Sequence, residues 1–490
     1  MMGMLVKIWL IAKVMKLLNI RNLYTFFKIL RKEGSNLLAI SKYVAYLYPQ
    51  KIALIDEKTE ISYQNLCQEA ESLASVLHQR GIRKQDRIGI LSKNNVNFVK
   101  ILLAASRLGA DVHLLNTAMS QEQLQALLQS KQISFLLQEQ ETNFQDVQSF
   151  LIEDLLSQRK ETIFLAPQTS KISVFTGGTS SQKVKVASRK TKAINFIEPF
   201  YALLHNAQLN KFESVYVALP AFHGFGLAAI ILALALGKKI ILTEKFELEK
   251  VENLLIRHKV EVWVLVPTIL QRLVLSQKKI QVACILTGGA ALPISLLHST
   301  QKRWGEIMYN LYGTSEIGFC IMAKPKDLLK KPQTLGKAIG GAKVKVEETG
   351  QMLVATSWAV EPDWIATGDL EYKDEEGYWY WKGRIDDMII SGGENVYLAD
   401  IEQIVFAYEP IFEAVALPTE DKEFGQRYYL FLVFKEGLHT EKEAFKDYLT
   451  KRLARFQMPK EIYILEKLPY TAIGKPDKKG LSKLYFDTKG

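Results

Sequence analysis

The sequence predicts an α/β protein with a large N-terminal domain and a small α+β C-terminal domain. Its 490 residues correspond to about three structural units at roughly 150 residues each, at least one of them large enough to bury a full core. Short apolar runs typical of strands alternate with segments of helical periodicity, the pattern of strands joined by helical crossovers. The 48% hydrophobic and 23% charged residues are an ordinary globular balance, which excludes general disorder and collagen-like structure.

The alternation begins after Pro49 and continues through the middle of the chain. Strands are expected at residues 51–55, 61–63 and 87–91, and helices at residues 64–80 and 97–108. Comparable apolar runs recur at residues 214–219, 230–236, 239–242 and 262–266. No internal repeat or low-complexity linker separates them.

A domain boundary is predicted near residues 383–387. Beyond it, residues 398–408 are expected to form a helix, residues 427–435 a strand, and residues 441–455 a second helix. Together they make a compact α+β unit of about a hundred residues. It ends in a Lys-rich tail that also contains Gly and Pro, residues 474–480.

The first 32 residues hold an unusual charge distribution. They contain no acidic residue and seven basic ones: Lys7, Lys13, Lys16, Arg21, Lys28, Arg31 and Lys32. The longest apolar run, residues 8–12, is far shorter than the roughly 20 residues of a membrane span, and no signal-peptide cleavage site follows. In helical projection, six of the seven cations fall within an arc of about 120°. Residues 1–45 are therefore predicted to be an amphipathic extension, broken near residues 19–22, that lies on an anionic membrane surface. The alternative is a helix packed on the protein body.

Charge and cysteine content restrict the partners. The chain has 63 Lys and Arg and 52 Asp and Glu, a net charge of +11, which favours an anionic partner. The lysines are dispersed without an aromatic-interleaved basic face, so nucleic-acid binding is not expected. The three cysteines are far apart and form no Cys-x-x-Cys pair, which argues against disulfides and zinc ribbons and for a reducing compartment.

Residues 174–183 are the first segment whose residue types could take part in ligand binding or catalysis. An apolar strand leads into glycines and hydroxyl residues and then into cations, a composition whose backbone N–H groups can wrap phosphate oxygens. It is not a Walker A loop, because no Gly-Lys-Ser/Thr follows at the required spacing. A polar surface turn is the alternative.

Three further segments have comparable character. Residues 310–316 place an aromatic ring before a tight turn, two hydroxyls and a carboxylate suited to Mg²⁺. Residues 366–369 end in an aspartate able to accept hydrogen bonds from vicinal ribose hydroxyls. Residues 382–395 join an arginine and paired acids to an apolar step and a Gly-rich turn, and the arginine can fork onto ribose or phosphate oxygens.

These four segments in this order, with Lys475 near the end, resemble the adenylate-forming superfamily of acyl-CoA synthetases, luciferases and peptide-synthetase adenylation domains. The resemblance covers about residues 46–485, and residues 312–316 and 383–395 are its most specific parts. It implies an AMP-binding large domain over residues 46–385, made of two α/β subdomains and a small β-barrel-like part. It also implies a mobile C-terminal lid over residues 386–490.

The resemblance also assigns roles to individual residues. Around the nucleoside it places Tyr312 on adenine, Asn310, Gly288, Gly289 and Ala290 about the base, and Asp369 with Arg384 on the ribose. Around the phosphates it places Thr176, Gly178, Thr179, Ser180, Lys183, Gly313 and Ser315, with Glu316 on Mg²⁺. Lys475 would neutralise the carboxylate and α-phosphate, two anions that otherwise repel each other. Asp386 would be the hinge, and Ser391, Gly392 and Gly393 would line the thiol channel.

The expected substrate is a medium- or long-chain fatty acid, activated with ATP and Mg²⁺ and passed to coenzyme A. Residues 223–236 are strongly apolar and are expected to be largely a buried helix, with His223 at the mouth of an acyl pocket beside Gly288 and Gly289. Such an enzyme would be cytoplasmic and peripheral at the inner face of the membrane. One alternative is a ligase that loads an acyl carrier protein.

The phosphate segment departs from the superfamily pattern. Gly177 and Ser181 replace the usual Ser and Gly, and Lys183-Val184-Lys185 replaces Pro-Lys-Gly. This departure leaves a third interpretation open, a membrane-associated nucleotide- or acyl-binding protein with weakened catalysis.

Overall fold

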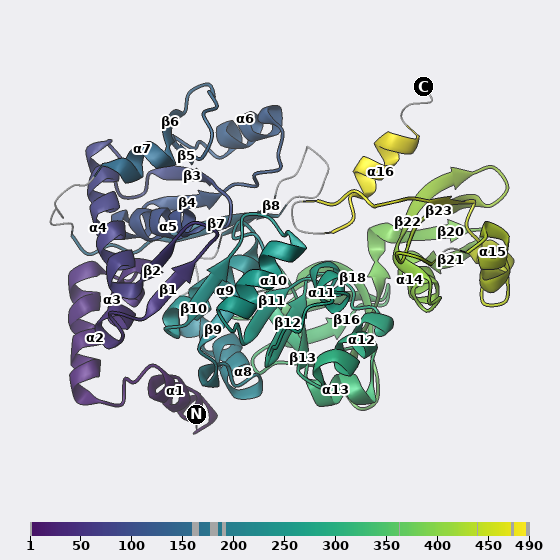
Figure 1. Ribbon diagram of the computed structural model, residues 1–490, viewed down its shortest axis with the longest axis horizontal. Coiled ribbons are helices and arrows are strands. Elements are labelled where there is room, and N and C mark those ends of the chain that lie inside the picture. Colours follow the sequence, from purple (N-terminus) through teal and green to yellow (C-terminus); the bar gives the residue numbers. More distant parts are fainter. Residues whose placement is uncertain are drawn as a thin grey trace.

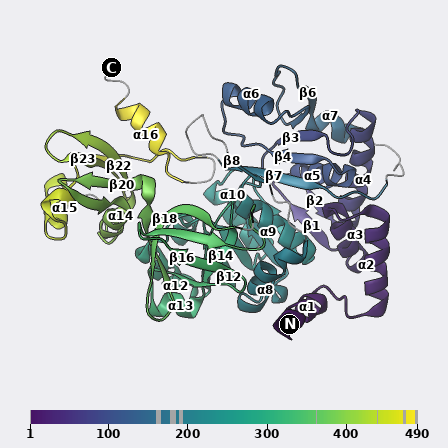
Figure 2. The same ribbon diagram turned by 180° about the vertical axis from the view of Figure 1, so that it is seen from behind.

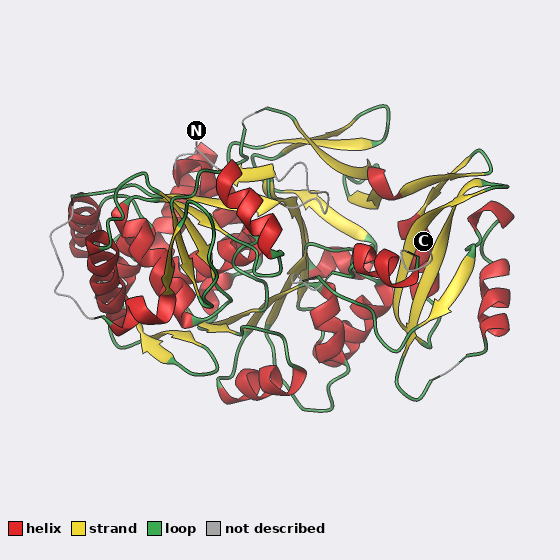
Figure 3. Cartoon of the chain, turned by 90° about the horizontal axis from the view of Figure 1, so that it is seen from above, coloured by secondary structure: helices red, strands yellow, loops and turns green. Residues whose placement is uncertain are grey.

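The computed structural model describes residues 2–158, 166–176, 185–188, 193–361, 363–438, 440–471 and 475–486. A large domain holds two sheets, and a smaller lobe at the C-terminal end holds a third (Figure 1). Seen from above, helices lie on both sides of the large-domain strands, and the C-terminal lobe stands apart (Figure 3).

The first sheet of the large domain has six strands in the order β6-β5-β3-β4-β7-β8. They are β3 (Arg87–Leu91), β4 (Asp111–Leu114), β5 (Phe135–Gln138), β6 (Gln148–Leu151), β7 (Lys171–Thr176) and β8 (Lys185–Ser188). All pairs are parallel except β7 with β8. The helices of this region are α4 (Tyr63–Gln79), α5 (Val96–Leu108), α6 (Gln121–Ser130) and α7 (Ile152–Ser157). Helix α5 is buried along almost its whole length, which explains its nearly continuous apolar sequence.

The second sheet has thirteen strands in the order β16-β17-β18-β19-β15-β14-β13-β12-β11-β9-β10-β1-β2. Its α/β part contains β1 (Ile52–Ile55), β2 (Glu60–Ser62), β9 (Ser214–Val217), β10 (Lys239–Leu242), β11 (Val262–Leu265), β12 (Cys284–Gly288) and β13 (Met308–Thr314). Its antiparallel part contains β14 (Gly318–Ala323), β15 (Thr334–Ala338), β16 (Lys343–Val346), β17 (Gln351–Ala355), β18 (Ile365–Lys373) and β19 (Trp379–Arg384). The central strands β9 and β11 are buried at every position, as parallel strands covered on both faces must be.

The helices of the second sheet are α8 (Ile197–Asn206), α9 (Gly224–Ala235), α10 (Leu248–Arg257), α11 (Pro267–Val274), α12 (Ile294–Trp304) and α13 (Pro325–Lys330). Residues 230–236, which also show strand-like alternation, lie in and just after α9. This agrees with the expectation of a buried helix over residues 223–236.

The C-terminal lobe has its own sheet, in which β21 (Glu394–Tyr397), β20 (Met388–Ser391), β23 (Gly425–Phe434) and β22 (Ile411–Asp421) follow in that order, and β24 (Glu461–Ile464) pairs with β23. Its helices are α14 (Leu398–Phe406), α15 (Lys442–Thr450) and α16 (Lys478–Tyr485). Two hydrophobic clusters built only from residues of this lobe hold it together, so its core is separate from that of the large domain.

Three helices precede β1: α1 (Met2–Val14), α2 (Ile20–Glu33) and α3 (Leu37–Leu47). Helix α3 lies in the large-domain core, where Leu38 and Val44 are buried. Residues 37–45 therefore belong structurally with the large domain, and only α1 and α2 remain of the predicted extension. The break between them, residues 15–19, lies just before the expected position. Among the described residues, no helix combines the length and apolar character that crossing a membrane requires.

Candidate active site

Asp369 is the centre of the best-connected polar cluster among the predicted residues. It lies on β18 and is only 6% exposed. The Tyr312 hydroxyl donates to its Oδ2 atom at 2.7 Å, and Trp381 Nε1 and Arg384 Nη1 donate to Oδ1 at 3.3 and 3.1 Å. A buried carboxylate with these three donors is held in one orientation, as an acceptor for ribose hydroxyls must be.

The β18–β19 register explains why Arg384 reaches Asp369. The two residues are direct partners in the antiparallel pair, so their backbones face each other. Arg384 also donates to the Thr367 carbonyl at 3.1 Å. Gly368 has a φ of +76°, and a Cβ there would approach Arg384 Nη2 to 2.9 Å. The positive φ therefore favours glycine at position 368, and a side chain there would also crowd the guanidinium.

A second carboxyl group, that of Glu371, is buried near this cluster. Burial raises its pKa well above the usual value, and the charge of Asp369 raises it further. Burial also raises the pKa of Tyr312, with additional contributions from Glu371 and Asp369. Burial therefore favours the neutral form of both groups, and the Tyr312 hydroxyl is a hydrogen-bond donor to Asp369.

The residues expected around the base come together at the ends of β12 and β13. Gly288 pairs with Leu311, and the buried Asn310 pairs with Thr287. A Cβ on Gly288 would lie 2.4 Å from the Leu311 carbonyl oxygen, so this glycine permits close strand approach. Strand packing thus accounts for a glycine at position 288, and its role in an acyl pocket stays a prediction. Gly289 and Ala290 follow the strand and are exposed.

Ser315 and Glu316 follow Gly313 in the hairpin between β13 and β14. A Cβ on Gly224, the first residue of α9, would lie 3.7 Å from Ser315 Oγ, so the start of α9 faces this hairpin. No group of three or more His, Cys, Asp or Glu side chains that could hold a metal occurs in the described part of the chain. Glu316 alone fits Mg²⁺, which proteins commonly hold through one or two carboxylates together with substrate phosphates.

Lys475 extends from the C-terminal lobe toward this cluster. Thr471 Oγ1 donates to the Lys475 carbonyl at 3.0 Å and the Thr471 N–H does so at 2.8 Å, which fixes the backbone of the lysine. Lys475 is exposed to solvent, but partial desolvation by the surrounding protein lowers its pKa. The negative charge of Asp369 raises the pKa, and the positive charge of Arg384 lowers it. The charge of the aspartate in one domain therefore acts on the pKa of the lysine in the other.

His223 precedes α9 and adjoins the same space. Its Nε2 atom is buried and has no hydrogen-bond partner among the described residues. Burial, and secondarily the charge of Lys475, lowers the pKa of His223 to about 4. The imidazole is therefore neutral at physiological pH.

The remaining predicted residues either lie outside the described part of the chain or are found elsewhere. Gly178, Thr179, Ser180 and Lys183 lie outside the described residues, as does the side chain of Thr176, the last residue of β7. Ser391, Gly392 and Gly393 form the β20–β21 turn, where Ser391 Oγ donates to the Phe456 carbonyl at 2.7 Å within the C-terminal lobe. Asp386 lies in a short 3₁₀ turn, Ile385–Asp387, between the domains, and its side chain is not among those described.

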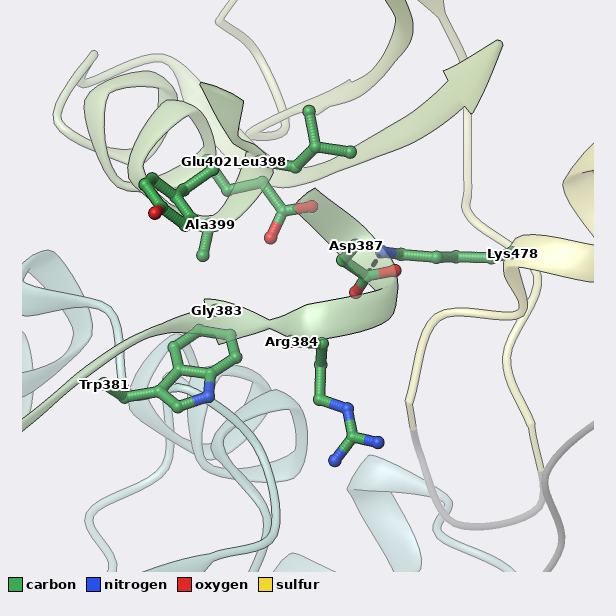
Figure 4. A pocket seen from close by; sticks show the side chains of 9 residues that line it. Trp381, Gly383, Arg384, Asp387, Leu398, Ala399, Glu402 and Lys478 are labelled. Carbon is green, nitrogen blue, oxygen red and sulfur yellow. Dashed lines mark hydrogen bonds and ion pairs between the residues drawn. The ribbon is translucent and has the colours of Figure 1, made fainter. Parts of the chain in front are cut away.

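A small pocket opens at this junction (Figure 4). Trp381, Gly383 and Arg384 line one side, and Ala399 and Glu402 of α14 line the other. Lys478 Nζ pairs with Asp387 at 2.9 Å across it.

Sequence reasoning missed the contacts that orient the two domains. Arg272 of α11 lies over the ring of Tyr470 at 5.1 Å, and Gln271 Nε2 donates to the Phe412 carbonyl of the small domain. It also missed Trp381 as a partner of Asp369. The only signal was its position three residues before Arg384 in the chain.

Comparison with known proteins identifies the class. The model of the AMP-binding enzyme family matches residues 42–357, and the model of the AMP-binding enzyme C-terminal domain matches residues 400–475. The chain belongs to the AMP-binding enzymes. The predicted fold class is confirmed, and so is the prediction of an AMP-forming acid–thiol ligase that uses ATP, Mg²⁺ and coenzyme A.

The most similar relatives include curated 2-succinylbenzoate–CoA ligases. The Bacillus subtilis enzyme is 27% identical over 88% of this chain and 94% of its own length. The Oceanobacillus iheyensis enzyme is 30% identical over 90% of this chain and 98% of its own. The solved B. subtilis o-succinylbenzoate–CoA synthetase with its acyl-adenylate intermediate has a TM-score of 0.79 at 26% identity, covering 91% of this chain and 98% of that chain. The same enzyme with ATP and magnesium gives 0.78 at 25%, covering 90% and 99%.

Proposed function

We propose that this enzyme activates o-succinylbenzoate, or a closely similar aromatic keto acid, to an acyl-adenylate and transfers the acyl group to coenzyme A. The observation that carries the reaction type is the buried Asp369 carboxylate held by Tyr312, Trp381 and Arg384, within electrostatic range of Lys475 from the other domain. The identity of the acid is supported by similarity to curated 2-succinylbenzoate–CoA ligases along almost the whole chain.

His223 supports a polar substrate over a fatty acid. A buried imidazole nitrogen without a partner costs free energy beside an alkyl chain, because the alkyl chain offers no hydrogen bond. A keto group or second carboxylate of the acid can accept a hydrogen bond from it. The relatives do not support the expected fatty acid or an acyl carrier protein as acceptor.

The site residues then divide the work. Asp369, held by Tyr312, Trp381 and Arg384, binds the ribose, and Asn310 lies beside the base. Lys475 reduces the repulsion between the attacking carboxylate and the α-phosphate of ATP. Glu316 would hold Mg²⁺, which when bound screens the phosphate charge.

Rotation of the small domain would then remove Lys475 and bring the turn of Ser391, Gly392 and Gly393 to the adenylate for thiol attack. Asp386 would be the hinge of this rotation. The limit between the large and the small domain, residues 385 and 386, is proposed on the same basis.

The test is pyrophosphate release by the full-length enzyme with ATP and Mg²⁺, across o-succinylbenzoate, benzoate and fatty acids of graded chain length. We expect o-succinylbenzoate to give the highest kcat/KM and coenzyme A to be acylated in the same reaction. Higher kcat/KM for a long-chain fatty acid would overturn the substrate assignment. Transfer to a phosphopantetheinylated carrier protein in preference to coenzyme A would overturn the acceptor. Absence of release with every acid would favour a binding protein with weakened catalysis.

A further inference from the structure

Helix α1 is apolar on nearly every face but is covered on only one. Ile11 and Val14 pack against the large-domain core, and Lys7 Nζ pairs with Glu198 of α8 at 2.7 Å. On the remaining surface Leu5 is 60% exposed and Trp9 is 51% exposed, with Val6 and Ile8 also exposed. A helix that is hydrophobic all round normally lies in a core or in lipid, so this exposed surface requires an explanation.

Helix α2 repeats the arrangement. Phe26 packs edge-on against Tyr43 of α3 at 5.0 Å, and Glu33 is buried in ion pairs with Lys42 and Arg107 at 2.7 Å each. These contacts hold the helix firmly on the protein body. Its opposite side exposes Ile20 (84%) and Phe27 (60%), together with Leu23 and Tyr24.

The exposed charge that the first 33 residues themselves contribute around these apolar side chains is positive. Six of the seven N-terminal cations are exposed: Lys13, Lys16, Arg21, Lys28, Arg31 and Lys32. The seventh, Lys7, is used in anchoring α1. The first acidic residue, Glu33, is buried and paired, so it does not offset the positive charge at the surface.

We propose that the exposed side of α1 and α2, referred to below as the N-terminal face, binds the surface of a bilayer containing anionic lipids. Interfacial aromatic and aliphatic side chains beside Lys and Arg are the features by which such helices lie in the headgroup region. The charge complementarity selects an anionic membrane over a neutral one. The anchoring contacts explain how the helices transmit this binding to the whole enzyme.

The position of the N-terminal face suits an enzyme whose small domain moves. Helix α2 and the C-terminal lobe lie at opposite ends of the molecule in Figures 1 and 2. The family match begins only at residue 42, so the face lies outside the catalytic fold. Membrane contact there leaves the motion of the C-terminal lobe unobstructed.

The experiment is co-sedimentation of full-length enzyme with vesicles of phosphatidylglycerol and phosphatidylcholine, and with vesicles of phosphatidylcholine alone. We expect binding to the first, little to the second, and weakening at high salt because salt screens the charges. The variant Ile20→Asp/Phe27→Asp and the variant Lys28→Glu/Arg31→Glu should each lose at least about tenfold in vesicle affinity. Both should keep wild-type Tm and pyrophosphate release in solution.

Matched controls come from α13, on another surface. Leu329 is 54% exposed, and Lys326 and Lys330 are exposed beside it. Leu329→Asp and Lys326→Glu/Lys330→Glu should bind vesicles like wild type. Equal binding by the N-terminal variants, or no binding by wild type, would overturn the proposal. The proposal would also be overturned if wild type were a dimer in solution and Phe27→Asp made it monomeric. In that case a second copy of the chain, and not a membrane, would cover the N-terminal face. The readout needs no substrate, so its failure is separate from failure of the proposed reaction.

Discussion

The Tyr312 hydroxyl donates a 2.7 Å hydrogen bond to Asp369, although their strands are not neighbours. Three strands, β14, β15 and β19, lie between β13 and β18 in the sheet order. In a flat sheet the two strands would be about 19 Å apart, four spacings of roughly 4.8 Å. The antiparallel part of the sheet therefore curls back on itself, and this curl brings Tyr312 to Asp369.

Replacing Tyr312 with Phe tests this link. The ring remains, but Asp369 loses a donor, and a hydrogen bond to a charged group is worth about 1.5–3 kcal/mol. We expect KM for ATP to rise about tenfold or more with a smaller change in kcat. The matched control is Tyr309→Phe on the same strand, whose hydroxyl donates to the Asn206 carbonyl at 2.9 Å, away from the nucleotide. Equal effects from both variants would show that the Tyr312 bond has no specific role.

Lys475→Ala tests the division between half-reactions. In the present arrangement of the domains, Lys475 is near enough to the Asp369 cluster for their charges to act on each other. Because the proposed role of Lys475 is to reduce the repulsion between the attacking carboxylate and the α-phosphate, its loss should abolish adenylate formation. Thiolation of supplied acyl-adenylate should persist, as measured by formation of the coenzyme A thioester. Lys479→Ala, an exposed lysine on α16, is the control and should retain both half-reactions. Equal loss of adenylation and thiolation in the Lys475 variant would refute the assignment.

Arg272→Ala tests the contact between domains. The guanidinium lies over Tyr470, five residues before Lys475, so its removal should loosen the placement of the lysine. We expect adenylation to slow about fivefold, since a cation–π contact contributes roughly 1 kcal/mol, while thiolation is unchanged. Arg257→Ala, an exposed arginine at the end of α10, should leave both rates as in wild type. A fall in thiolation as well would assign Arg272 a role beyond this contact.

His223 makes a prediction about pH and stability. Its pKa is lowered to about 4 by burial and by Lys475, so the folded state resists protonation while the unfolded state protonates near pH 6.5. The stability contribution is therefore complete above about pH 6.5 and declines as pH falls toward 4. Between pH 7.5 and 5, the free energy of unfolding should fall by about 2 kcal/mol less in His223→Asn than in wild type. Urea denaturation at the two pH values measures this difference. Identical pH profiles would contradict the low pKa.

Two regions show which parts of the fold could be predicted from the sequence and which could not. The strand predicted at residues 87–91 is found with the same bounds as β3, because apolar runs closed by polar residues determine local structure. Residues 37–45, by contrast, are assigned to the extension by charge pattern but are buried as part of α3. Their burial depends on contacts with α4 and α5, which local pattern does not encode.

The sequence by itself determined the class of the enzyme, because four motifs in a fixed order, with Lys475 near the end, resemble the adenylate-forming superfamily. Only the tertiary structure decided how these groups meet. Curling of the sheet joins Tyr312 to Asp369, and contacts of α11 with the small domain accompany an electrostatic influence of Asp369 on Lys475 across the domain boundary. These relationships are set by packing between residues distant in the chain, and no local periodicity or motif spacing records them.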